Sequence, residues 1–178
     1  IYDRERDTAG YARSANRLAA RAGVALDRGE KLNGEISAGW VAERFDDERL
    51  GRLSAFTIDG HLNWSPIRGT MIGLTGTTEI EGTTTAGERG SVRYSALLSA
   101  ERELRANLTG RTALGAALRN YAGSGERDLT LTAEASLTWW LNRMAGLTGR
   151  VRHERLDSTI AGRDSRSTSV FLGLTLQR

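Results

Sequence analysis

The segment LTLTAEASLTW, residues 129–139, alternates apolar and polar residues without a break. Successive side chains of a β-strand point to opposite faces, so one face of this segment is apolar and the other carries hydroxyl groups and a carboxylate. A tilted strand of about 9–11 residues crosses the hydrocarbon layer of a membrane. The segment therefore predicts a membrane-spanning strand with one face toward lipid and the other toward a polar lumen.

The same alternation recurs along the chain, with a period of about 38 residues that contains two strands. Polar loops near residues 10, 48, 86, 125 and 161 alternate with tight turns near residues 29, 67, 104 and 143. The strands predicted between them lie at residues 16–26, 32–43, 56–64, 72–81, 91–101, 107–119, 129–139, 147–154 and 167–178, with the end of a tenth at 1–6. The sequence thus predicts an all-β, antiparallel, up-and-down transmembrane β-barrel, with about ten strands in this segment, long loops on one side and short turns on the other.

Composition narrows the functional classes. The chain has 178 residues, 26% of them charged, with 21 glycines, one proline and no cysteine. No stretch approaches the ~18 consecutive apolar residues of a membrane-spanning helix. The lack of cysteine excludes a disulfide framework and thiolate metal ligands. The net charge of +3 comes from basic residues mixed with acidic ones, so no nucleic-acid partner is expected.

The placement of loops and aromatic residues predicts an orientation. Outer-membrane barrels keep their short turns in the periplasm, and this chain ends on the side of the short turns. We therefore predict the outer membrane of a Gram-negative-type bacterium, with a periplasmic C-terminus. Aromatic residues near strand ends are typical of the interfacial girdles of such barrels, although they also suit the core of a soluble sheet. The predicted membrane-interface aromatics are Trp40, Phe56, Trp64, Tyr94 and Trp139.

Several segments resemble known proteins. Residues 170–178, VFLGLTLQR, are similar to the terminal strand that the barrel-assembly machinery recognises, but Arg178 stands where an aromatic residue is usual. The segment GHLNWSP, residues 60–66, and the opening YDR, residues 2–4, resemble the putative β-barrel porin type 2 family. This resemblance implies that residues 1–178 form a single outer-membrane barrel domain, the C-terminal part of a larger barrel. It also implies polysaccharide-export components as partners.

Charged residues alternate with the apolar ones and are expected to face the interior of the barrel. In a wide barrel such side chains line a water-filled channel and set its selectivity. In a narrow barrel they pair across the interior and fill it, because an unpaired buried charge is costly. The number of strands decides between these cases, since barrel diameter grows with it. The predicted lumen-lining residues are Arg17, Arg21, Glu35, Asp59, His61, Glu79, Arg93, Arg111, Arg119, Glu134, Arg150 and Arg152.

No catalytic, cofactor-binding or metal-binding constellation is predicted. His61 lies two residues from Asp59 on the predicted lumen face, where such a pair could orient a general base, but no serine is tied to it by sequence. The two histidines of the chain lie on different strands without cysteines, which is weak support for a metal site. A polar ladder in the lumen is the preferred interpretation of His61.

The sequence favours a porin-like channel or an export conduit, for small polar solutes or polysaccharide. Three alternatives stay open: a plugged barrel that serves as a membrane anchor or assembly partner, an outer-membrane enzyme, and a soluble β-propeller. Propeller blades have four short strands in each repeat, whereas this repeat has two long ones. Outer-membrane lipid and lipopolysaccharide are expected partners, because loop arginines such as Arg127 and Arg163 could contact phosphate groups. The oligomeric state is left open.

Overall fold

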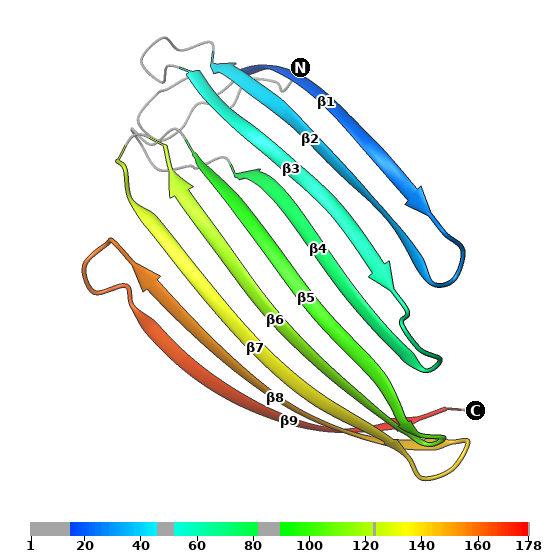
Figure 1. Cartoon of the computed structure of the whole chain (residues 1–178). Helices are drawn as coiled ribbons and strands as arrows, with labels where there is room; N and C mark the ends of the chain where they lie inside the picture. Colours follow the sequence, from blue (N-terminus) through cyan, green and yellow to red (C-terminus); the bar gives the residue numbers. More distant parts are fainter. Residues whose placement is uncertain (1–14, 46–51, 82–89, 123, 178) are drawn as a thin grey trace.

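The computed structural model of the protein describes residues 15–45, 52–81, 90–122 and 124–177, which form one antiparallel sheet and its connections (Figure 1). Each strand pairs with the next one along the chain, so the order in the sheet is the order in the sequence. The strands are β1 (Ala15–Asp27), β2 (Leu32–Phe45), β3 (Arg52–Trp64), β4 (Thr70–Glu81), β5 (Ser91–Arg105), β6 (Leu108–Tyr121), β7 (Arg127–Trp140), β8 (Ala145–Ser158) and β9 (Ser165–Leu176). None of the described residues forms a helix that could cross a membrane.

The nine predicted strands are confirmed, and most of them are longer than predicted. The turn predicted near Leu104 lies slightly further along the chain, at residues 106–107, because β5 continues to Arg105. A register shift between Glu103 and Arg105 lets the β5–β6 ladder continue past Leu104, as a β-bulge does. The predicted strand at residues 1–6 lies outside the described residues. So do the centres of the loops predicted near residues 10, 48 and 86.

The register keeps apolar and polar residues in phase from strand to strand. Residues directly opposite each other in an antiparallel ladder lie on the same face of the sheet. Leu62, Leu74 and Leu98 are successive partners across β3, β4 and β5. Glu101 and Arg111 are partners across β5 and β6. The sheet therefore has one apolar face and one polar face, as the alternation predicts.

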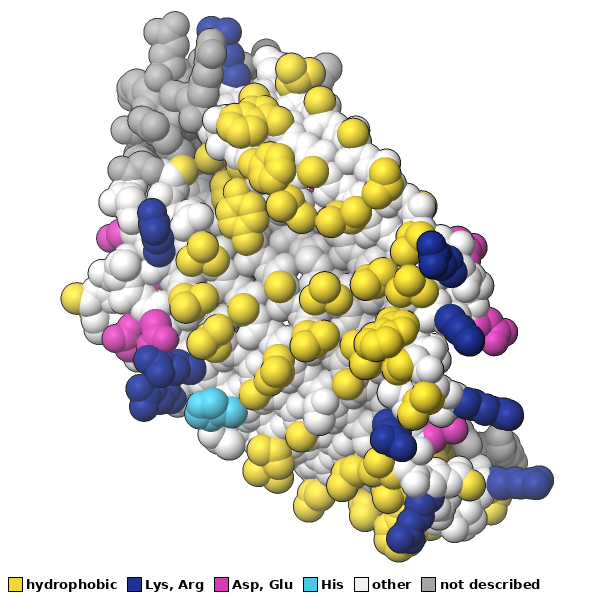
Figure 2. Space-filling view, in the orientation of Figure 1, with side chains coloured by type: hydrophobic (Ala, Val, Ile, Leu, Met, Phe, Trp, Pro, Cys, Tyr) yellow, Lys and Arg dark blue, Asp and Glu magenta, His cyan; other side chains and the backbone are white. Residues whose placement is uncertain are grey.

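The apolar face is exposed. Figure 2 shows apolar side chains spread over this face, with most of the charged side chains toward its margins. Leu18 on β1 and Leu172 on β9 are each 76% exposed. Soluble monomers rarely expose apolar patches beyond a few hundred Å². A single sheet of long strands also contradicts the soluble propeller, whose blades each have four short strands.

One ladder of the sheet is short, and we call this place the seam. Strands β3 and β4 pair only where Gly60–Trp64 faces Ile72–Gly76, whereas every other ladder runs along most of its strands. Beyond Gly60, side chains replace the missing backbone bonds. Thr78 Oγ1 accepts a hydrogen bond from Ile58 N at 2.9 Å and donates one to Ile58 O at 2.8 Å. Asp59 Oδ1 accepts a hydrogen bond from Thr78 N at 2.7 Å.

The main buried apolar cluster lies beside the seam. Its buried members are Val41, Leu53, Ala55 and Val92, and Ile80, Tyr94 and Ala122 pack against them. Val41 and Ala55 occupy polar-face positions of β2 and β3, whereas Val92 occupies an apolar-face position of β5. The polar face of β2–β3 thus packs on the apolar face of β4–β5 at this end. Val92, which the alternation assigns to lipid, is consequently only 7% exposed.

Candidate functional site

The polar face is the candidate functional surface, because the register gathers the predicted lumen-lining residues on it. The structure places Arg17 and Arg21 on β1, Glu35 on β2, Asp59 and His61 on β3, Glu79 on β4, Arg93 on β5, Arg111 and Arg119 on β6, Glu134 on β7, and Arg150 and Arg152 on β8. Their shared face follows from the backbone pairing. That this face encloses a lumen stays a prediction.

An ion pair crosses β2 at the seam side of this surface. Arg21 Nη2 lies 2.8 Å from Asp59 Oδ2, although the two residues belong to β1 and β3. Gly39 is the residue of β2 that lies opposite Arg21 and opposite Thr57. A Cβ atom added at Gly39 would lie 3.1 Å from Arg21 Cβ, so glycine leaves the arginine free to pass over β2.

Asp59 and His61 do not pair with each other, as the preferred interpretation of His61 as part of a polar ladder expects. Both carboxylate oxygens of Asp59 have other partners, Arg21 and the backbone N–H of Thr78. His61 instead lies near Glu35, its cross-strand partner, with 3.9 Å between Nδ1 and Oε1. Among the described residues, no serine hydroxyl is hydrogen-bonded to His61. The arrangement is that of a polar ladder and lacks the geometry of a general base with its nucleophile.

Further ion pairs follow β4 to β8 along the polar face. Those between strands are Arg93–Glu79 at 3.7 Å, Arg119–Glu81 at 2.9 Å and Arg150–Glu134 at 3.6 Å. Arg152 pairs with Glu154 on its own strand at 2.8 Å. All of these side chains are partly exposed. Such exposed pairs each contribute about 0–1 kcal/mol, so they can rearrange at little cost.

Between the charged residues lies a patch of uncharged and mostly small side chains, which we call the neutral panel. On β5 it separates Arg93 from Glu101, and on β6 it separates Arg119 from Arg111. The panel consists of Gly73, Thr75, Thr77, Ser95, Leu97, Ser99, Ala113, Gly115, Ala117, Thr130 and Thr132. Thr77 and Ser95 share a hydroxyl–hydroxyl hydrogen bond of 2.6 Å across β4 and β5. On β4 to β6 the middle of the polar face is therefore uncharged, with charged residues on either side along the strands, which we call its rims.

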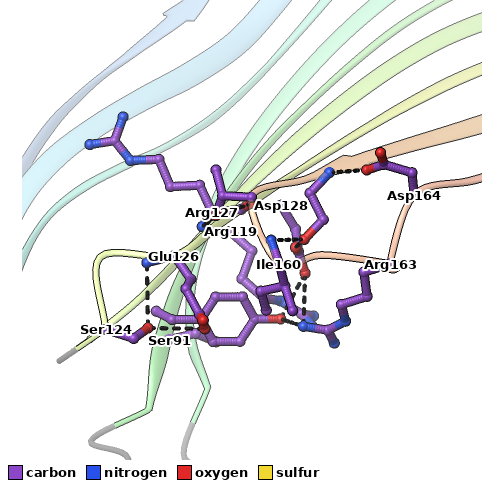
Figure 3. Close-up of polar contacts among 12 residues, drawn as sticks. Ser91, Arg119, Ser124, Glu126, Arg127, Asp128, Ile160, Arg163 and Asp164 are labelled. Atoms are coloured by element: carbon purple, nitrogen blue, oxygen red, sulfur yellow. Dashed lines mark hydrogen bonds and ion pairs between the residues drawn. The ribbon is translucent and has the colours of Figure 1, made fainter.

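The rim at the loop end is reinforced by a buried carboxylate (Figure 3). Asp128 is only 6% exposed. It accepts hydrogen bonds from Tyr121 Oη at 2.7 Å and from Ser158 Oγ at 2.6 Å. Arg163 Nη1 donates to Tyr121 Oη at 3.0 Å and lies 3.5 Å from Asp128 Oδ2. The segment 159–164 between β8 and β9 is thereby held against the polar face.

The family follows from the whole chain. A family model described as putative beta-barrel porin 2 matches residues 1–178. The chain belongs to this family. The resemblance seen in the sequence is thus confirmed. No curated protein matches the chain.

Membership of the β-barrel porin 2 family directs attention to the two faces of the sheet. The described residues contain no group of three or more His, Asp or Glu side chains that could hold a metal ion. A β-barrel porin has a polar inner face and an apolar outer face. This sheet likewise has one polar face and one apolar face. The polar face is therefore the surface where the function of this chain is best sought.

The predicted membrane-interface aromatics lie on the apolar face of this porin-family sheet. Trp40 and Phe56 are direct cross-strand partners on β2 and β3, and they are 54% and 46% exposed. Trp64 and Trp139 lie at the turn ends of β3 and β7 and are 47% and 48% exposed. Tyr94 differs, because it is half-buried beside the seam and its hydroxyl donates to Phe56 O at 2.9 Å. Their role as girdles stays a prediction.

Sequence reasoning missed an aromatic residue on the polar face. Phe171 lies opposite Arg150 across β8 and β9, and Arg150 Cζ is 5.7 Å from the centre of its ring. An arginine over an aromatic ring makes a favourable cation–π contact. The sequence contains a signal for it: Phe171 lies between Val170 and Leu172, so the alternation places its side chain on the face opposite to theirs.

Proposed function

We propose that this protein forms the wall of an outer-membrane channel that passes small polar solutes or polysaccharide. The observation that supports this function is the neutral panel between two charged rims. Hydroxyl groups of the panel can exchange hydrogen bonds with water and with sugar hydroxyls, and its small side chains leave room along the surface. Rims of mixed charge hold water without strongly attracting ions of one sign. Polysaccharide-export components are the partners that this proposal expects.

The channel requires strands beyond those described. Strands β1 and β9 are each paired on one side only in the described sheet. Unpaired backbone N–H and C=O groups are too costly in lipid for an open edge to persist there. We assign the missing pairing to further strands of the same protein. In this arrangement residues 124–126 and 159–164 lie outside the cell, and the short turns lie in the periplasm, where the assembly machinery engages β9.

The test is conductance through the full-length protein, refolded from detergent into a planar bilayer. Steady conductance is expected, and the variant Ala117→Arg should shift the reversal potential in a salt gradient toward anion selectivity, because it adds a charge to the neutral panel. Ser124→Arg adds the same charge at an exposed position between β6 and β7 and should change selectivity much less. Equal effects of the two variants would contradict a conducting path along the panel.

A plugged barrel is the second candidate, since Arg163 and Asp128 hold segment 159–164 against the polar face. In that case the paired charges fill the interior, and the barrel acts as a membrane anchor or an assembly partner. A folded, heat-modifiable protein that stays silent in the bilayer would favour this function and reject the channel.

A further inference from the structure

The apolar face of β8 and β9 becomes basic toward the loops. Its pairs nearest the turns are all apolar or glycine. They are Ala145–Leu176, Leu147–Leu174, Gly149–Leu172 and Val151–Val170. The next pair toward the loops is His153–Thr168, and the one after it is Arg155–Arg166. From the turns to the loops this face therefore changes from apolar to polar to positively charged. A phosphate-bearing lipid changes in the matching order, from acyl chains to anionic headgroup.

The two arginines face each other directly. Like charges at opposed positions of a ladder repel each other. Asp157 neutralises Arg155 in part, with 2.8 Å between Arg155 Nη2 and Asp157 Oδ1. No acidic residue within the described ranges lies at ion-pair distance from Arg166. The pair Arg155–Arg166 therefore keeps a net positive charge, and it lies on the apolar face of the sheet.

The polar pair next to the arginines adds hydrogen-bonding groups. His153 Nδ1 and Thr168 Oγ1 lie 2.8 Å apart across β8 and β9, and both side chains are exposed. This contact fixes the imidazole ring and leaves Nε2 without a partner among the residues that the structure describes. Two guanidinium groups and an imidazole edge therefore point away from the sheet within a few rungs of one another.

An apolar groove of about 660 Å³ begins next to these groups. Val151 and Val170 line its end on β8 and β9, one rung from His153–Thr168. Its floor is made of small residues on neighbouring strands, including Ala135 and Gly149, and its wall includes leucines of β7 and β9. The groove thus begins one rung from the basic cluster, and its part on β7 to β9 is lined on the apolar face by Ala135, Leu137, Gly149, Val151, Val170 and Leu172.

We propose that this surface binds one phosphate-bearing lipid of the outer leaflet. Arg155 and Arg166 hold its phosphate group, His153 donates to the headgroup, and one acyl chain lies in the groove beyond Val151. Guanidinium groups suit phosphate because they form paired, charge-assisted hydrogen bonds. A phosphate between the arginines also relieves their repulsion. The inference rests on the outer-membrane location proposed above and is independent of transport.

The test is native mass spectrometry of the full-length protein, refolded in detergent and titrated with bisphosphorylated lipid A. The wild type is expected to retain one lipid. The double variant Arg155→Gln/Arg166→Gln should bind it at least tenfold more weakly. Arg152→Gln lies on the same strand but on the polar face, so it should bind as the wild type does. Heat-modifiability of each variant checks that it is folded, and the single variant Arg166→Gln serves if the double variant is not.

Two further probes separate a lipid site from a simple anion site. Dephosphorylated lipid A should bind weakly, and millimolar inorganic phosphate should not displace bisphosphorylated lipid A. Gly149→Leu, which places its side chain toward Leu172 in the groove, should weaken binding of the lipid. Unchanged binding by the arginine variants, equal loss in Arg152→Gln, or displacement by inorganic phosphate would each overturn the proposal. Because binding is read without conductance, its failure is distinguishable from failure of the channel.

Discussion

At the scale of the residue, Asp128 ties together three neighbouring segments at the loop end of the polar face. Tyr121, Ser158 and Arg163 all converge on its carboxylate, which is nearly buried. Removing a buried acceptor leaves its donors without partners and costs about 1–3 kcal/mol, more for a charged group. We expect Asp128→Ala to release segment 159–164, and trypsin to cleave after Arg163 at least ten times faster, as followed by mass spectrometry.

Asp157→Ala is the matched control for this variant. Asp157 is also an acid near the loop end, on β8, but its side chain is 41% exposed and contacts Arg155 on the other face. Its loss should leave cleavage after Arg163 nearly unchanged. If both variants are cleaved at the wild-type rate, the carboxylate of Asp128 does not hold the segment. Sequence patterning could not find this network, because Arg163 and Tyr121 are separated by 42 positions and meet only through the fold.

At the scale of the element, the hydroxyl of Thr78 replaces part of the ladder between β3 and β4. It serves both the N–H and the C=O of Ile58. We expect Thr78→Val to lower stability by about 1–3 kcal/mol, because two hydrogen bonds to backbone groups are lost and each contributes about 0.5–1.5 kcal/mol. The measurement is the urea midpoint of the refolded protein, together with hydrogen exchange at the Ile58 amide, which should accelerate.

Thr75→Val is the control, since Thr75 lies on the same strand and its hydroxyl has no hydrogen-bond partner among the described residues. An equal loss of stability in both variants would show that the seam does not depend on Thr78. The strands themselves could be predicted, because period-two alternation is a local property of the chain. The seam could not, because a threonine at an apolar-face position of β4 reads as a tolerated substitution until its partner strand is known.

Element ends also explain which surface residues the sequence revealed. The eighth strand was predicted to stop at residue 154 and the ninth to begin at residue 167, each too short at the loop end. The pair Arg155–Arg166 lies one position beyond both of these limits. The alternation of apolar and polar residues becomes weaker near the loop ends of the strands, because charged residues occur there on both faces of the sheet. The alternation pattern therefore does not predict the basic pair Arg155–Arg166. It does assign the apolar residues next to that pair, such as Val151 and Val170, to the correct face.

At the scale of the whole molecule, the decisive question is whether the apolar face meets lipid and the polar face meets water. Trp139 and Trp140 are neighbours in the chain, but β7 turns them to opposite faces. Trp139 is 48% exposed on the apolar face. Trp140 covers Gly146 on the polar face, where a Cβ added at that glycine would lie 2.9 Å from Trp140 Cε3. The two side chains therefore report on the two environments at one depth.

Single-tryptophan variants of the protein, refolded into vesicles, turn this arrangement into a measurement. We expect brominated lipid to quench Trp139 several times more strongly than Trp140, because only Trp139 contacts acyl chains, and aqueous acrylamide to show the reverse preference for an open lumen. Strong quenching of Trp139 by bromolipid with weak quenching of Trp140 by both agents would indicate a barrel whose interior is filled. Equal quenching of both tryptophans by bromolipid would contradict a membrane-spanning sheet, since two faces of different polarity could not then share one surrounding.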